Sequence, residues 1–151
     1  MIALYSSQET TRRAGTGKLL PRDTSAKHRS AYGKYTYAAT GAIGDTIDFC
    51  IVPTGARITL FGLISCSAGT ASATLDLGLK TLAAGTVVAA AGVASAANIA
   101  AAGQKTANNG TLITSGAEYI TTEPCILYGT VAGANPPSGQ TIIVDIPYVK
   151  D

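Results

Sequence analysis

A two-residue alternation of apolar and polar side chains, repeated in short segments from Tyr35 onward, restricts the fold of this chain more than any other sequence feature. Successive side chains of a strand point to opposite faces, so the pattern is typical of antiparallel strands with one buried face. Turn-forming residues separate the segments at Pro53-Thr54-Gly55, at Asn108-Asn109-Gly110 and over 134–139. Short strands between such turns predict an all-β sandwich or barrel, and we expect an antiparallel β-sandwich. The alternating apolar positions are Tyr35 and Tyr37; Ile47, Phe49 and Ile51; Ala73, Leu75, Leu77 and Leu79; and Ile142, Val144, Ile146 and Tyr148.

One segment is apolar on both of its sides. Residues 57–65 contain Ile58, Leu60, Phe61 and Leu63 without a polar alternation. A short continuous apolar run between turns is typical of a fully buried strand. We therefore expect a central strand that is covered on both faces.

An alanine-rich segment interrupts the strand pattern. Residues 83–103 include eleven Ala among 21 residues. The spacing of Val93 and Ala97 predicts a short helix over Val93–Ala102 that ends at Gly103, with an irregular loop as the alternative. A stack of small side chains also suits close contact with another backbone, either in the protein's own sheet or in a neighbouring subunit.

The charges divide the chain into a basic N-terminal stretch and a mildly acidic remainder. Residues 1–34 carry seven Lys or Arg against two acidic residues (net +5), and residues 35–151 carry four against seven (net −3), which sum to the chain's +2. The middle of the stretch has neither a helical nor a strand period, so it offers no face to bury. We expect an extended arm over 1–34 that orders only against a partner, followed by a sandwich domain over 35–151. The residues expected to contact that partner are Arg12, Arg13, Lys18, Arg22, Lys27 and Arg29.

The arm contains a short sequence that resembles the end of a phosphate-binding loop. In Gly15-Thr16-Gly17-Lys18, the first glycine of a complete loop would fall at Arg12, and the metal-binding hydroxyl would fall at Leu19. That loop also follows a buried strand and opens a helix, whereas this segment follows a polar run and reaches Pro21. The spacing therefore excludes a nucleotide-binding loop.

The composition favours a protein whose surface is covered in an assembly. Charged residues make up 13% of the chain, about half the usual share. A surface with so few charges is weakly protected against association. We expect no membrane span, because the most apolar stretch, Val87–Ala102, is too short and is interrupted by polar residues. Met1–Leu4 is likewise too short for the apolar core of a secretory signal, so we expect synthesis in the cytoplasm.

Cysteine and histidine offer little for catalysis or metal binding. Cys50, Cys66 and Cys125 are widely spaced, form no close pair, and are expected to be buried free thiols in strands. The single histidine, His28, lies in the arm, where it cannot serve as the base for a cysteine nucleophile. We expect no metal site and no cofactor.

The strand carboxylates leave two alternatives open. Asp48, Asp76 and Asp145 each fall on the polar side of a predicted strand. Two of them could meet across neighbouring strands and act as a glycosidase pair or bind a cation, or all three belong to solvated sheet faces. We favour the solvated faces and predict that the protein is not an enzyme.

The partner of the arm is either nucleic acid or protein. Seven basic residues can contact phosphates, but no aromatic side chain lies between Arg12 and Arg29 for stacking on bases, and the remainder of the chain is acidic. An acidic protein surface accounts for the same charges. We therefore predict a protein partner, and nucleic-acid binding is not expected.

Several turn motifs resemble one known family. They are Gly44-Asp45, Pro53-Thr54-Gly55-Ala56-Arg57, Leu75-Asp76-Leu77-Gly78 and the closing strand Ile146–Asp151. Over about residues 31–151 their order resembles that of the capsid cement or decoration proteins, small structural proteins of tailed-bacteriophage virions. The resemblance implies a jelly-roll-like β-sandwich that assembles as dimers or trimers on the virion's capsid surface. It also implies that the major capsid protein is the partner, whereas the arm matches nothing specific in the family.

Two further functions are compatible with a small β-sandwich. A tail, head–tail or fibre-associated virion protein would share the fold and differ in the number of copies per particle. A carbohydrate-binding module would present exposed aromatic side chains to sugars, for which Tyr119 and Tyr128 are the candidates in the second half of the chain.

Overall fold

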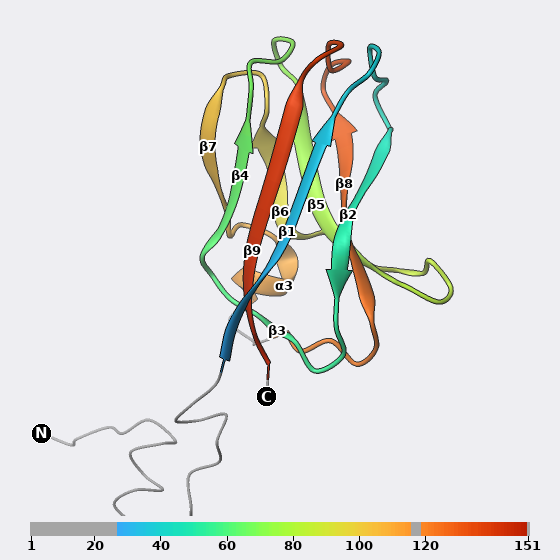
Figure 1. The fold of residues 1–151 in the computed structure, drawn as a ribbon, viewed down its shortest axis with the longest axis vertical. Coiled ribbons are helices and arrows are strands. Elements are labelled where there is room, and N and C mark those ends of the chain that lie inside the picture. The colour runs from blue at the N-terminus through green and yellow to red at the C-terminus, as the bar shows by residue number, and fades with distance from the viewer. Residues whose placement is uncertain (1–26, 116–118, 151) are drawn as a thin grey trace, which may run out of the picture.

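The chain folds into a sandwich of two antiparallel sheets (Figure 1). The structure, a computed structural model, describes residues 27–115 and 119–150. Sheet A has the strand order β1-β9-β4-β7, with β3 paired to β9, and sheet B has the order β2-β8-β5-β6. The strands are β1 (Lys27–Thr36), β2 (Thr46–Val52), β3 (Arg57–Ile58), β4 (Gly62–Cys66), β5 (Thr74–Thr81), β6 (Val87–Asn98), β7 (Gly103–Ala107), β8 (Cys125–Ala132) and β9 (Thr141–Lys150).

The pairing of the strands is that of a jelly roll. When the two-residue strand β3 is left aside, the first strand pairs with the last, the second with the second to last, and so on inward to the β5–β6 hairpin. A long antiparallel hairpin that is rolled over two sheets produces this order, with two Greek keys. The prediction of an all-β, jelly-roll-like antiparallel sandwich is therefore confirmed.

The core lies between the inner faces of the two sheets. From Thr141 to Val149 of β9 the even-numbered residues are buried and the odd-numbered residues are half-buried, as the alternation predicted. Leu75, Leu77 and Leu79 of β5 are fully buried against the opposite sheet. Burial of each such side chain contributes about 1.5–3 kcal/mol to stability. The chain has two phenylalanines and no tryptophan, and its core consists chiefly of aliphatic residues.

The helix predicted over Val93–Ala102 is wrong, because residues 87–98 form strand β6. Val93 and Ala97 are buried in the sandwich core, and Ala96 has a left-handed φ of 49°, which no regular α-helix contains. Pairing with β5 satisfies the backbone and outweighs the helical propensity of alanine. Within the described residues the helical turn is α3 (Thr111–Thr114), which the sequence did not predict.

The small residues of this region serve close backbone contact within the protein's own fold. Leu77 of β5 pairs with Ala94 of β6 and Leu79 pairs with Ala89, so one residue of β5 lies opposite four residues of β6. The extra β6 residues bulge over Gly78, where a Cβ atom would lie 2.3 Å from the carbonyl oxygen of Ala89. The expected contact of small residues with their own sheet is therefore confirmed.

The prediction of one covered central strand over residues 57–65 is also wrong. The segment divides into β3 and β4, and the residues between them lie at the surface, where Leu60 is 58% exposed and Phe61 is 77% exposed. Thr59 donates both its backbone N–H and its hydroxyl to the carbonyl of Pro147, which turns the chain between the two strands. Strand β4 does lie inside sheet A, but its outward residue Leu63 has no covering layer in the described chain.

The start of β1 sets where the sandwich begins. Strand β1 spans Lys27–Thr36, so residues 27–34, which were assigned to the arm, pair with β9. Residues 1–26 lie outside the described residues. No helix of the described chain is long and apolar enough to cross a membrane.

Candidate interaction surface

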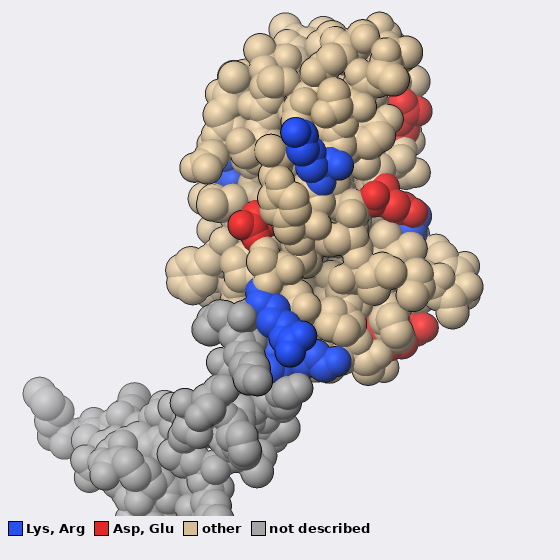
Figure 2. Space-filling view, viewed as in Figure 1, with Lys and Arg blue, Asp and Glu red and all other residues tan. Residues whose placement is uncertain are grey.

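Basic residues collect at the end of sheet A where β1 begins and β9 ends. Lys27 stands opposite Lys150 in the strand register, and Arg29 stands opposite Tyr148. Arg57 of β3 joins them from the other side of β9, opposite Val149. Figure 2 shows this gathering of Lys and Arg at the lower end of the molecule, on a face that is otherwise largely uncharged. We call Lys27, Arg29, Arg57 and Lys150 the basic end.

The predicted contact residues fall into two groups. Arg12, Arg13, Lys18 and Arg22 lie outside the described residues. Lys27 and Arg29 lie on β1 within the basic end, and Arg29 is exposed. Sequence reasoning missed Arg57 and Lys150, because only the pairing of β9 with both β1 and β3 brings them beside Lys27 and Arg29.

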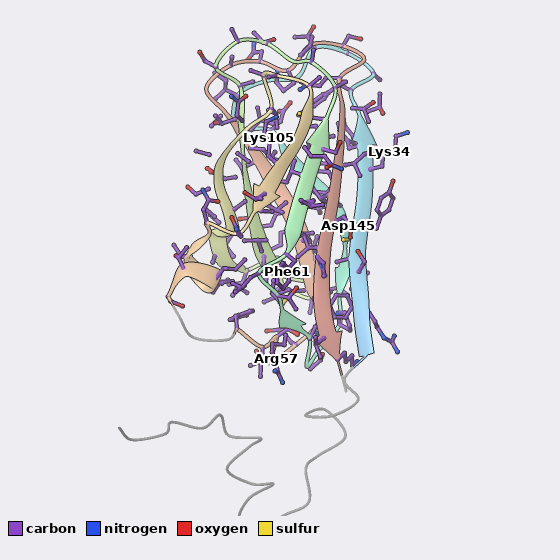
Figure 3. The ribbon with its side chains drawn as sticks, turned by 90° about the vertical axis from the view of Figure 1, so that its left-hand side faces the viewer. Lys34, Arg57, Phe61, Lys105 and Asp145 are labelled. Carbon is purple, nitrogen blue, oxygen red and sulfur yellow. The ribbon has the colours of Figure 1, made fainter. Side chains whose placement is uncertain are left out.

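A second feature is the outward face of sheet A, where side chains from four strands form rows. One row runs Tyr32, Asp145, Leu63, Thr106 across β1, β9, β4 and β7, and the next runs Lys34, Ile143, Ser65, Gln104. Tyr32 is 57% exposed and Leu63 is 38% exposed. Figure 3 shows Phe61 at the lower part of this sheet and Lys34 near its upper end. We call these two rows the sheet A face.

The charges of the sheet A face are sparse. Asp145 accepts a hydrogen bond from the Ser30 hydroxyl through its Oδ1 atom. Lys34 is exposed, and no ion pair joins it to a carboxylate of the described residues. The face is thus a mixed surface of apolar and polar side chains that carries one cation and one anion on neighbouring strands.

A third feature is an apolar hairpin at the connection of β5 and β6, which projects from the side of the sandwich in Figure 1. The turn is closed by the Thr81 N–H, which donates to Thr86 O at 2.8 Å, and by Gly85, whose φ of 66° suits the left-handed region. Leu82, Val87 and Val88 are all exposed on it. We call residues 81–88 the apolar hairpin.

The tyrosines considered for sugar stacking are not available for it. Tyr128 is only 4% exposed, with the Lys80 ammonium 5.2 Å from its ring centroid, and Tyr119 packs against the core. Among the described residues, the exposed aromatic side chains are instead Tyr32, Tyr35 and Phe61. The two-residue alternation could have indicated Tyr32 as an outward residue, since it precedes Tyr35 by an odd number of positions.

The three strand carboxylates do not converge. Asp48 forms an ion pair with Lys80, with Oδ1 2.6 Å from Nζ, and Asp76 accepts the Ala96 N–H at 2.7 Å. Asp145 lies on the other sheet. Among the described residues, no group of three or more His, Cys, Asp and Glu side chains could hold a metal ion.

The thiols are structural. Cys66 and Cys125 are buried in β4 and β8, as predicted, whereas Cys50 of β2 is half-buried; none of the three forms a disulfide. Burial raises the pKa of all three thiols, to about 11 for Cys50. A raised pKa lowers the thiolate fraction at neutral pH, so these groups are poor nucleophiles.

Comparison with solved structures identifies chains that have a similar fold. No family model matches the chain, and no curated protein matches its sequence. A chain of the capsid asymmetric unit of cyanophage Pam1 matches the structure with a TM-score of 0.61 and 16% identity, over 100% of both chains. A chain of the capsid of Ralstonia phage GP4 matches with a TM-score of 0.66 and 18% identity, over 89% of this chain and 92% of that one. At these identities, what the three chains share is the jelly-roll sandwich.

Proposed function

We propose that this protein is a bacteriophage virion structural protein, and specifically a decoration or cement protein that binds the outer surface of the major capsid protein shell. One observation carries the proposal: the structural match to a chain of a phage capsid extends over the whole of both chains. The likeness therefore extends over the full length of the two compared chains. The absence of converging catalytic groups in the described residues is compatible with a structural role.

The contact with the shell is assigned to the basic end and the arm. The arm's Arg12, Arg13, Lys18 and Arg22 precede Lys27 in the chain, and Lys27 begins β1 at the basic end. The segment that carries the arm's cations therefore leads directly into β1 at the basic end. Arginine side chains bind carboxylates through paired hydrogen bonds, so an acidic region of the capsid protein is the surface that fits.

Stabilisation of the shell follows from preferential binding. A ligand that binds the assembled shell and not the free capsid protein stabilises the assembled state by mass action. If each copy spans a junction between capsid subunits through the arm and the basic end, the two contacts reinforce each other, because binding at one raises the effective concentration at the other.

Cosedimentation of the full chain with empty capsids of its own phage tests the proposal. We expect about one bound copy for each capsid subunit, shells that resist heat better when decorated, and binding that weakens as salt rises. Removal of residues 2–26, or the double variant Arg29→Gln/Lys150→Gln, should weaken binding at least tenfold. Lys105→Gln is the control, because it removes a cation from β7, far from Arg57 of the basic end in Figure 3.

Other results of these experiments would assign the chain a different function or a different contact surface. A few copies per particle, located at the portal or tail, would replace the decoration role with that of a tail, head–tail or fibre-associated protein. An arm-deleted chain that binds shells as tightly as the full chain would remove the arm and its basic residues from the contact. Binding to a glycan array through Tyr32 or Phe61, without binding to shells, would make the chain a carbohydrate-binding module.

A further inference from the structure

We propose that Asn109 is a site of spontaneous deamidation, and that the folded chain protects it by pairing the residue with the free edge of β6. The reaction converts the side-chain amide to a carboxylate and needs water but no enzyme. The inference goes beyond the proposed function and does not depend on a role in the virion. It rests on the sequence Asn109-Gly110 and on the hydrogen bonds that hold this dipeptide against β6.

The chemistry of the Asn109-Gly110 bond makes it reactive. The backbone nitrogen of Gly110 attacks the side-chain carbonyl carbon of Asn109, and a C–N bond forms to close a five-membered succinimide. The attacking nitrogen gives up its proton, and the side-chain nitrogen leaves as ammonia. Water then opens the ring to aspartate or isoaspartate. A following glycine hinders the attack least, because it has no side chain.

The other asparagines of the chain lack this arrangement. Asn98 is followed by Ile99, whose side chain is branched, and Asn108 is followed by Asn109. Asn135 is followed by a proline, which has no N–H for the reaction. Asn109 is therefore the asparagine of this sequence that should react fastest when the chain is unfolded.

Strand β6 has an irregular stretch next to this dipeptide. It is the last strand of sheet B, and at Ser95 and Ala96 it has one residue more than the facing stretch of β5. Side chains bond the backbone there. Asp76 of β5 accepts the Ala96 N–H through Oδ1 at 2.7 Å, and Ser95 pairs with the side chain of Asn109.

Asn109 and Gly110 cover the edge of β6 as a short strand would. Asn109 Oδ1 accepts the Ser95 N–H at 2.9 Å, and Asn109 Nδ2 donates to Ser95 O at 2.8 Å. The Gly110 N–H donates to Val93 O at 3.1 Å. A Cβ atom at Gly110 would lie 2.3 Å from the carbonyl oxygen of Gly92, so glycine fits this position. We call Asn109 and Gly110 the edge cap, which occupies groups that an uncovered edge offers to other chains.

The same hydrogen bonds hold the two reacting groups apart from their reaction. Cyclisation requires the Asn109 amide to turn away from Ser95 and the Gly110 nitrogen to leave Val93 O. Both bonds to Ser95 and the bond to Val93 must therefore break first. The reaction then proceeds only from a locally opened state, whose population sets the rate.

The product cannot rebuild the edge cap. An aspartate at this position still accepts the Ser95 N–H, but it has no proton to donate and places a negative charge against Ser95 O. An isoaspartate also lengthens the backbone before Gly110 by one carbon, which shifts that residue from Val93 O. Deamidation thus converts a transient opening of the β6 edge into a permanent one.

Peptide mapping by mass spectrometry is the first test. The full chain is incubated at pH 8 in native buffer and in urea, and the conversion of each asparagine is followed with time. In urea, Asn109 should react at least about tenfold faster than Asn98 or Asn108. In native buffer, its reaction should be at least about tenfold slower than in urea, because the opened state is rare.

Two aspartate variants test whether local opening at β6 controls the rate. Asp76→Ala removes the acceptor of the Ala96 N–H and should speed the reaction of Asn109 severalfold in native buffer. Asp48→Ala is the matched control, because it removes a carboxylate of sheet B that pairs with Lys80, and it should leave the rate unchanged. Circular dichroism verifies that both variants are folded.

A product variant tests the effect of the modification. Asn109→Asp should lower the unfolding temperature by a few degrees. Asn108→Asp makes the same charge change at the neighbouring residue and should leave the unfolding temperature unchanged. If Asn109→Asp does not fold, deamidated wild-type chain refolded from urea provides the same comparison.

Three results would overturn the inference. The first is conversion of Asn109 in urea that is no faster than that of Asn98 and Asn108. The second is conversion in native buffer as fast as in urea, which would show that pairing with β6 does not protect the residue. The third is an unfolding temperature of Asn109→Asp equal to that of Asn108→Asp.

Discussion

The Lys80 ammonium lies 5.2 Å from the centroid of the Tyr128 ring and 2.6 Å from Asp48 Oδ1, so one side chain of β5 binds groups on β8 and β2 across the outer face of sheet B. Lys80 thereby covers an aromatic ring that would otherwise face solvent. The ammonium is held by a cation–π contact and by an ion pair, each modest at a partly exposed site.

Substitution of this lysine should therefore cost little compared with loss of the ring. Lys80→Gln is expected to lower the free energy of unfolding by about 0.5–1 kcal/mol, with a smaller effect at high salt. Tyr128→Ala should lower it by about 3 kcal/mol, because the buried ring fills volume. Urea unfolding of both variants measures the two values. Equal losses would show that the ring contributes only through the lysine.

A methyl group at Gly78 should destabilise the protein because it would collide with neighbouring backbone atoms, and not because of the backbone conformation of residue 78. A Cβ at this position would lie 2.3 Å from the carbonyl oxygens of Ala89 and Ala90, which belong to the β6 bulge. Gly78→Ala is therefore expected to cost about 2 kcal/mol or more, since backbone atoms must move.

The control for this prediction is Gly85→Ala in the apolar hairpin. Its Cβ would meet nothing within 4 Å, and its φ of 66° alone should cost about 1 kcal/mol. Denaturant unfolding compares the two variants directly. A Gly78→Ala protein that is as stable as the wild type would show that β6 does not lie over Gly78.

The three thiols should be protected in the folded protein. Because burial raises the pKa of Cys50 to about 11 and raises those of Cys66 and Cys125, little thiolate exists at pH 8. An aromatic disulfide reagent is expected to label none of them rapidly in native buffer and all three in denaturant. Rapid labelling of Cys66 or Cys125 at pH 8 would contradict their burial.

Tyr37 should make stability depend on pH in alkaline solution. Burial, followed by the charges of Asp45 and Tyr35, raises the pKa of its hydroxyl to about 12 from an ordinary value of 10. Below pH 10 both the folded and unfolded states keep the proton, so stability is unaffected. Between pH 10 and 12 the unfolded state ionises first, and the free energy of unfolding falls as the pH rises.

The variant Tyr37→Phe isolates this effect. The buried hydroxyl has no hydrogen-bond partner among the described residues, so its removal should raise stability by about 1 kcal/mol at pH 7. Above pH 10 the variant should become progressively more stable than the wild type. Parallel stability curves for the two proteins up to pH 12 would show that Tyr37 ionises normally.

Local patterns predicted the strands whose two faces differ. In β9 and β5 the alternation names the buried residues correctly, and Pro53-Thr54-Gly55 forms the predicted turn, in which the Ala56 N–H donates to Pro53 O. These features depend on neighbouring residues in the chain. The side-chain period of a strand and the conformational preferences of Pro and Gly act locally, so they are legible in the sequence.

The tertiary structure decided the features that depend on distant partners. Alanine favours a helix in isolation, but pairing with β5 makes residues 87–98 a strand. Leu60 and Phe61 look like core residues, yet they lie at the surface, in the connection between β3 and β4. The basic end likewise exists only through the register of β9 with β1 and β3. The sequence by itself thus determined the strand character and the charge of the chain. The tertiary structure determined which side chains form a surface together, because strand register and the packing of one sheet on the other arise from long-range hydrogen bonding and burial.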